Sequence, residues 1–257
     1  MHDSFDSKPL SLERTGAFQL PGGPILGSST ELFLLDLLKA RSPETRKVLE
    51  AGLSPQEQEE ALQRSWSSEK RLARAWVRRI LGYYLGIEPQ AVDLQRAPGG
   101  KPWVPQADLH FNLSHSGPYL LFAISARGPL GCDMEVERPR HRLSALLERV
   151  FSKEEQERIR PLSPEDRLNA FYRSWTLKEA YVKAVGKGIA LGLENVVLHE
   201  NHQGFLRLPQ GNPEAFRIWH RFREGIHLAL VAPGPDLKIR LWDATGQDGD
   251  QGIRDLV

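Results

Sequence analysis

Two acidic residues in the stretch GCDMEVE, residues 131–137, have a spacing that could bind a metal ion. Acidic and apolar residues alternate there, so Asp133 and Glu135 should project from one face of a strand. Two carboxylates held about 6–7 Å apart repel each other, and a cation beside them would relieve the repulsion. Mg²⁺ suits such oxygen ligands and completes its shell with phosphate oxygens and water. Gly131 leaves room for a group to approach, although a half-exposed strand with solvated acids would show the same pattern.

A third acid lies in WTLKEAYVKAVGKG, residues 175–188, which has the apolar spacing of a helix with one buried side. Glu179 and Lys183 are four residues apart, a spacing that is also common in surface pairs worth about 0.3–0.5 kcal/mol. Gly186 suits the left-handed residue that ends a helix. The spacing alone does not separate a surface pair from a functional one.

A third group of candidates lies in RAPGGKP and FNLSHSG. Lys101 follows two glycines and precedes a proline, which favours an extended conformation with the ammonium at the rim of a sheet. Ser114 and His115 offer donors of the kind that bind phosphate, whereas His115 could equally be a core histidine. As neighbours on a strand they face opposite ways, which disfavours a serine–histidine nucleophile pair.

Composition restricts the class of protein. The chain has 257 residues and a net charge of +1, so no overall basic field favours nucleic acid. No apolar run approaches the roughly 20 residues of a membrane span, and the first residues lack a signal-peptide pattern. We therefore expect a cytoplasmic protein that binds neither nucleic acid nor membrane. Its single cysteine, Cys132, excludes an internal disulfide and is expected to be buried.

The order of predicted elements indicates an α+β fold. An apolar run at 31–38, a strand or a buried helix, precedes helices near 54–66 and 68–85; strands follow at 109–116, 119–125 and 130–137. Helices near 143–160 and 163–185 then lead to strands near 194–200, 205–209, 216–222, 226–233 and 238–243. We expect a flexible extension at 1–29 and two comparable halves, 30–127 and 128–257, the second of which carries the acids.

Taken in order, GKP, FNLSHS, GCDMEVE and WTLKEAYVKAVGKG resemble the 4'-phosphopantetheinyl transferases of the Sfp type. The resemblance runs from about residue 53 to 193. It implies an enzyme that moves the 4'-phosphopantetheine arm of coenzyme A to a serine of an acyl or peptidyl carrier protein and releases adenosine 3',5'-bisphosphate. It also implies a monomer of two similar halves related by pseudo-two-fold symmetry, with the active site in the cleft between them. The carrier could belong to fatty acid, polyketide or nonribosomal peptide synthesis.

The resemblance also implies roles for particular residues. Asp133, Glu135 and Glu179 would bind Mg²⁺ with the coenzyme A pyrophosphate. Lys183 and His115 would stabilise developing charge, and Glu179 would act as the base, directly or through water. The coenzyme A phosphates would contact Arg96, Lys101, Ser114, His115 and Lys183.

One stretch departs from the family pattern, because the helix after SP, where lysine or arginine often holds the 3'-phosphate, reads SPQEQEE. Arg64, with Lys70 or Arg71 as substitutes, is the candidate for that contact. An acidic carrier could dock on basic residues at one of two places, namely Arg140, His141 and Arg142, or Arg74 and Arg78.

Two other functions remain open. The same three acids could serve a metal-dependent pyrophosphohydrolase of nucleotides or coenzyme A, with water as the nucleophile. A degenerate relative could bind coenzyme A or carrier proteins without turnover, but all three acids are present.

Overall fold

The structure is a computed structural model of the chain, and it describes residues 29–39, 43–97, 99–105, 107–140, 143–188, 191–243 and the backbone of 254–255. The predicted extension at 1–29 lies outside this part of the chain, apart from Ser29. Helices and strands both contribute, so the predicted α+β class is confirmed.

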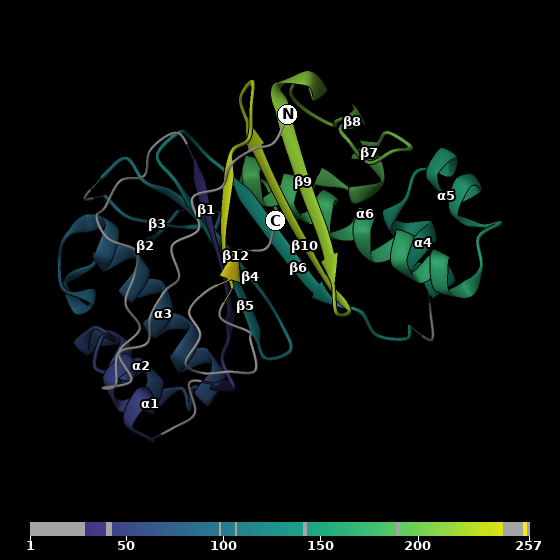
Figure 1. Ribbon diagram of the computed structural model, residues 1–257. Helices are drawn as coiled ribbons and strands as arrows, with labels where there is room; N and C mark the ends of the chain where they lie inside the picture. Colours follow the sequence, from purple (N-terminus) through teal and green to yellow (C-terminus); the bar gives the residue numbers. More distant parts are fainter. Residues whose placement is uncertain are drawn as a thin grey trace.

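Helices occupy the two ends of the molecule, with α1–α3 on one side and α4–α6 on the other (Figure 1). The α-helices are α1 (Pro43–Glu50), α2 (Pro55–Gln63), α3 (Ser68–Leu85), α4 (Leu143–Val150), α5 (Lys153–Ile159) and α6 (Pro164–Val185). Short 3-10 helices are η2 (Pro89–Ala91), η4 (Leu193–Asn195) and η5 (Pro213–Ala215).

Two sheets lie between the helices. The strands are β1 (Thr30–Asp36), β2 (Gln95–Arg96), β3 (Pro102–Trp103), β4 (His110–Ser116), β5 (Tyr119–Ser125), β6 (Gly131–Val136), β7 (Val197–Leu198), β8 (Phe205–Arg207), β9 (Phe216–Arg223), β10 (Ile226–Pro233), β11 (Ile239–Asp243) and β12 (Arg254–Asp255). The larger sheet has the order β12-β11-β1-β5-β4, and the smaller has the order β6-β10-β9. β2 with β3 and β7 with β8 form separate pairs.

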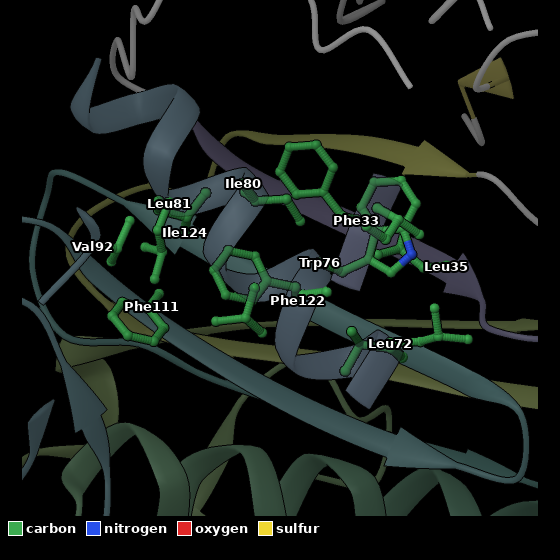
Figure 2. Packing of buried hydrophobic residues seen from close by; sticks show 14 of the residues in the cluster. Phe33, Leu35, Leu72, Trp76, Ile80, Leu81, Val92, Phe111, Phe122 and Ile124 are labelled. Atoms are coloured by element: carbon green, nitrogen blue, oxygen red, sulfur yellow. The ribbon is translucent and has the colours of Figure 1, made fainter. Parts of the chain in front are cut away.

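The apolar run at 31–38 forms a strand because both of its faces are covered. On one face of the larger sheet Phe33 and Phe122 pack against Trp76 and Ile80 of α3 (Figure 2). On its other face residues such as Leu32 pack against the smaller sheet, in a core that includes Cys132, Met134, Leu228 and Leu230. A strand buried on both sides has a continuous apolar sequence, which explains why periodicity did not separate it from a helix.

One strand of the second predicted half joins the sheet of the first. Residues 239–243 pair in parallel with β1 as strand β11. The chain therefore returns to the first sheet after completing the second. This pairing covers the edge of β1 that β5 leaves open.

The helical stretch near 143–160 consists of two helices, α4 and α5. Ser152 breaks the run and begins α5, accepting a hydrogen bond from Glu155 N while Glu155 accepts one from Ser152 N. This reciprocal capping satisfies two backbone donors at the new helix end. Ser54 caps α2 in the same way, with Glu57 as its partner.

Lys178 of α6 is fully buried and joins three parts of the second half. Its ammonium donates to Glu155 Oε2 at 2.7 Å, to Val150 O at 2.9 Å and to Leu193 O at 3.2 Å. All three of its N–H groups are thus used within the protein. It is a structural cation and not a free phosphate contact.

Lys178→Met should lower the free energy of unfolding by about 3 kcal/mol, because the Glu155 carboxylate would stay buried without its cation. Urea denaturation followed by circular dichroism measures this loss. Adding Glu155→Gln to Lys178→Met should recover part of it, since the unpaired charge is gone. A loss below about 1 kcal/mol would show that the pair is not a main support of this half.

Candidate active site

The space beside Gly131 is filled by the backbone of α6. A Cβ atom at Gly131 would lie 2.0 Å from Ala180 O and 2.3 Å from Ala184 N. Only glycine permits this approach of helix to strand. It brings Glu179 and Lys183, each next to one of those helix residues, over the strand that carries Asp133 and Glu135.

Lys183 contacts the strands rather than forming a simple surface pair with Glu179. Its ammonium lies 2.6 Å from Asp133 Oδ1 and 3.0 Å from Ser114 Oγ. Asp133 is 5% exposed, so this ion pair is largely withdrawn from solvent. Three distant segments, β4, β6 and α6, therefore meet at one carboxylate.

Strand β4 holds β6 through alternate polar side chains. Asn112 Oδ1 accepts from Cys132 N at 2.9 Å, and Ser114 Oγ donates to Asp133 Oδ1 at 2.7 Å. Ser116 Oγ donates to Glu135 Oε2 at 2.9 Å and accepts from Val136 N at 3.1 Å. The N-x-S-x-S pattern of FNLSHS thus orients both strand acids across the seam between the two sheets.

The intervening residues of β4 line a cavity of about 470 Å³ on the other face of the strand. Its walls are Leu37, Ser67, Glu69, Lys70, Ala73, Arg74, Val77, Arg96, Pro102, Leu113, His115, Gly117 and Leu120. His115 is exposed, which excludes the core-histidine interpretation. Ser114 and His115 face opposite ways, as strand alternation predicts, so they do not form a nucleophile pair. Apolar walls with several cations suit a nucleotide with phosphates.

Burial raises the pKa of all three acids, and neighbouring carboxylates add to this rise for Glu179 and Glu135. Burial raises the pKa of Asp133, while Lys183 and Ser114 oppose that shift. Burial also raises the pKa of Glu179, and the nearby charges of Asp133 and Glu135 add to it. The pKa of Glu135 is raised by burial, with Ser116 opposing and Asp133 contributing. The carboxylates are therefore close enough to repel, which is the condition that a cation would relieve.

Residues 129–231, which contain all of the acids, match the model of the 4'-phosphopantetheinyl transferase superfamily. A 4'-phosphopantetheinyl transferase of Bacillus subtilis is 31% identical over 59% of this chain and 67% of its own length. The chain belongs to the 4'-phosphopantetheinyl transferase superfamily. Two further relatives are HetI of Nostoc, 42% identical over 46% of this chain and 51% of its own length, and Sfp of Bacillus subtilis, 29% identical over 62% and 71%. The chain thus spans about half to seven tenths of the relatives it matches.

For a member of this superfamily, the predicted phosphate contacts are only partly brought together. Arg96 and His115 share the cavity, and they are joined there by Lys70, which was only a substitute candidate. Lys70 also lies 4.1 Å from the centre of the Trp66 ring. Arg64 ends α2, is exposed and does not contribute to the cavity wall. Lys101 donates to two backbone carbonyls instead of standing at a rim.

One of the two predicted docking sites needs a correction. Arg78 is 4% exposed, pairs with Glu57 and donates to the carbonyls of Pro89 and Val92, so it cannot meet a partner protein. Arg74 also pairs with Glu57. Glu57 belongs to α2, the acidic helix that departs from the family pattern. This helix therefore supplies the carboxylate that pairs with two arginines of α3. Nothing in an amphipathic pattern reveals that one arginine of the basic side is buried.

The other docking site is described in part. Arg140 is exposed, and its Nε donates to Tyr172 OH of α6 at 2.8 Å. Tyr172 stands two helical turns before Glu179. The charge of Arg140 opposes the rise that burial causes in the pKa of Glu135. Arg140 therefore lies beside the acids. His141 and Arg142 are outside the described residues.

The donor set fits a hard cation such as Mg²⁺. Asp133 Oδ2 is buried and has no hydrogen-bond partner in the described part of the chain, so this oxygen can act as a ligand. Glu135 and Glu179 supply further carboxylate oxygens, the ligand type that Mg²⁺ prefers. Within the described ranges no set of three acidic, histidine or cysteine side chains has the arrangement of a ready-made metal site.

No helix in the described ranges is long and apolar enough to cross a bilayer.

Proposed function

We propose that this protein transfers the 4'-phosphopantetheine arm of coenzyme A to a serine of an acyl or peptidyl carrier protein, with Mg²⁺, and releases adenosine 3',5'-bisphosphate. The observation that carries the proposal is the convergence of Asp133, Glu135, Glu179 and Lys183 across β4 from a cation-lined cavity. The cavity would hold a nucleotide on one side of β4, and the acids and Lys183 would support phosphoryl transfer on the other.

Asp133, Glu135 and Glu179 would hold the Mg²⁺, which when bound neutralises charge on the pyrophosphate. Ser114 and Ser116 fix the orientation of the two strand carboxylates. Lys183 is poised to exchange its Asp133 partner for the β-phosphate. Because phosphoryl transfer depends chiefly on positioning and charge, these contacts are the protein's main contribution.

Glu179 would accept the proton of the carrier serine, directly or through water. Burial and the two neighbouring acids raise the pKa of its carboxyl, which brings it closer to the pH at which a general base is most effective. Its place on the rigid helix α6 fixes the direction of attack. A water molecule in place of the serine would give the pyrophosphohydrolase reaction instead.

The cavity would receive the nucleotide of coenzyme A. Arg96, His115 and Lys70 supply donors for phosphates, and Leu113 and Val77 supply apolar contacts for the base. Lys70 takes the place proposed for Arg64, since it lies in the cavity wall. The first predicted half, 30–127, would then contribute the cavity, and the second, 128–257, would contribute the acids. The pseudo-two-fold symmetry and the cleft between the halves remain predictions.

The activity is tested by the intact mass of an apo acyl carrier protein and an apo peptidyl carrier domain after incubation with this protein, coenzyme A and Mg²⁺. The expected result is a gain of about 340 Da, the mass of the transferred arm, that disappears with EDTA. Relative rates show which carrier is preferred. Unmodified carriers with released adenosine bisphosphate would overturn the transfer and favour the hydrolase, and no reaction of either kind would favour a degenerate relative.

Ser116→Ala should raise the Mg²⁺ concentration for half-maximal transfer by about tenfold, because Glu135 loses the hydroxyl that orients it. Magnesium titration of the transfer rate measures this. Ser125→Ala is the matched control, since this buried serine of β5 accepts a hydrogen bond from Arg127 N. An equal shift in both variants would assign the effect to general loosening of the sheets.

Arg140→Glu should raise the Michaelis constant for carrier protein by about tenfold and leave that for coenzyme A unchanged, because a positive surface charge beside the acids would meet an acidic carrier. Steady-state kinetics with each substrate varied in turn measure this. Arg217→Glu is the control for charge reversal elsewhere, since Arg217 is a half-buried arginine of β9 that donates to Pro235 O and Glu214 O. A change confined to the Michaelis constant for coenzyme A would contradict the docking role of Arg140.

A further inference from the structure

The GGKP loop lies against the C-terminal end of α6, although about 80 residues separate them in the chain. Its own turn is tight, with Gly100 N donating to Ala97 O at 2.7 Å and Ala97 N donating to Lys101 O at 2.9 Å. A Cβ atom at Gly99 would lie 3.1 Å from Gly186 O. The loop therefore approaches the end of the helix with its backbone.

Lys101 completes this contact with its side chain. Its ammonium donates to Lys183 O at 2.9 Å and to Leu130 O at 2.9 Å. Lys183 O belongs to the last turn of α6, whose carbonyls lack partners within the helix, and Leu130 directly precedes the first residue of β6. One cation thus ties the helix that carries Glu179 and Lys183 to the strand that carries Asp133 and Glu135.

The position of the Lys101 ammonium at the C-terminal end of α6 is also favourable electrostatically. The C-terminal end of a helix carries partial negative charge, and a cation there stabilises it. Two of the three N–H groups of Lys101 are committed to these carbonyls, which leaves at most one for a substrate. The neighbouring Arg96 differs, because it lines the cavity and its Nη1 donates to Gly100 O of the same loop, at 3.3 Å.

We propose that Lys101 is a positioning residue that holds the last turn of α6 on β6, and so sets the reach of the Lys183 ammonium, instead of acting chiefly as a phosphate contact. The kinetic consequence rests on the proposed transferase function. The structural contact does not, so the two can be tested apart.

The kinetic test compares Lys101→Met with Arg96→Met in the full chain, with coenzyme A varied. Lys101→Met should lower kcat about tenfold and change the KM for coenzyme A less than about threefold, whereas Arg96→Met should chiefly raise that KM. In a Lys183→Met background, Lys101→Met should have an effect below about twofold, because it acts through Lys183. Lys101→Arg, which keeps a cation with several donors, should recover most of kcat. The proposal would be overturned if Lys101→Met raised the KM for coenzyme A tenfold and left kcat intact. It would also be overturned if the losses in kcat from Lys101→Met and Lys183→Met multiplied in the double variant.

Amide hydrogen exchange tests the contact without any reaction. In Lys101→Met the amides of residues 184–188 should exchange about tenfold faster than in the unaltered chain, while those of α3 stay unchanged. Arg96→Met should leave residues 184–188 as they were. Unaltered exchange in Lys101→Met would overturn the proposal even if transfer is lost. Absence of transfer by the unaltered chain would overturn only the proposed function, since the exchange result still decides whether Lys101 holds α6.

Discussion

Replacing Glu179 with glutamine should lower transfer to carrier protein by at least about a thousandfold while the fold stays intact. Glutamine keeps the size of the side chain but can neither accept the serine proton nor supply a negatively charged ligand. Glu179 is half-buried, and the charges of Asp133 and Glu135 add to the burial that raises its pKa. Stability should not fall, because the substitution removes repulsion among three acids.

The measurement is the initial rate of carrier modification by intact mass, with circular dichroism to confirm the fold. Glu165→Gln is the matched control, since Glu165 lies in the first turn of the same helix and is exposed. It should retain nearly full activity. If Glu179→Gln kept more than about a tenth of the rate, the base and ligand roles would both have to move to other residues.

Gly131→Ala should lower the free energy of unfolding by at least about 3 kcal/mol and the transfer rate by more than about a hundredfold. Its new Cβ would collide with Ala180 O and Ala184 N, at 2.0 Å and 2.3 Å. Both atoms belong to the helix backbone, so no side-chain rotation relieves the contact. The helix must move away from β6, and Glu179 moves with it.

Gly204→Ala controls for the change from glycine to alanine itself. A Cβ atom there meets nothing closer than His199 Cδ2 at 3.6 Å, an ordinary contact. With no clash, the stiffer unfolded chain should leave stability equal or slightly higher, by about 0.5 kcal/mol. Urea denaturation of both variants decides the question. Similar midpoints would show that α6 can shift on β6 without cost, which would remove the steric explanation for glycine at 131.

Local patterns in the sequence were sufficient for most of the elements. The caps at Ser54 and Gly186 follow from hydrogen bonding and backbone conformation within a few residues, so they were predictable. The alternation in GCDMEVE placed Cys132 and Met134 in the core and Asp133 on the opposite face. The lengths of the short strands β7 and β8, which have two and three residues, were overestimated. Apolar residues there fill a core beside η4 and do not extend a long ladder.

Roles of cations were harder to predict, because a lysine or arginine has the same sequence signature at the surface and in the interior. Arg78 and Lys178 are buried with acidic partners 21 and 23 residues away. Lys70 enters the cavity wall, and Arg64, six residues earlier, does not. Each outcome depends on where the long side chain finds acceptors, and those acceptors come from other elements.

By itself the sequence determined the chemistry available to this protein: three carboxylates, a lysine one turn after Glu179, and the family to which their order belongs. Only the tertiary structure decided how they meet. The close approach of α6 at Gly131, the serines of β4 that orient Asp133 and Glu135, and the return of β11 to the first sheet all join segments far apart in the chain. Such contacts arise from burial and from backbone and side-chain hydrogen bonds between elements, and residue spacing within one element does not reveal them.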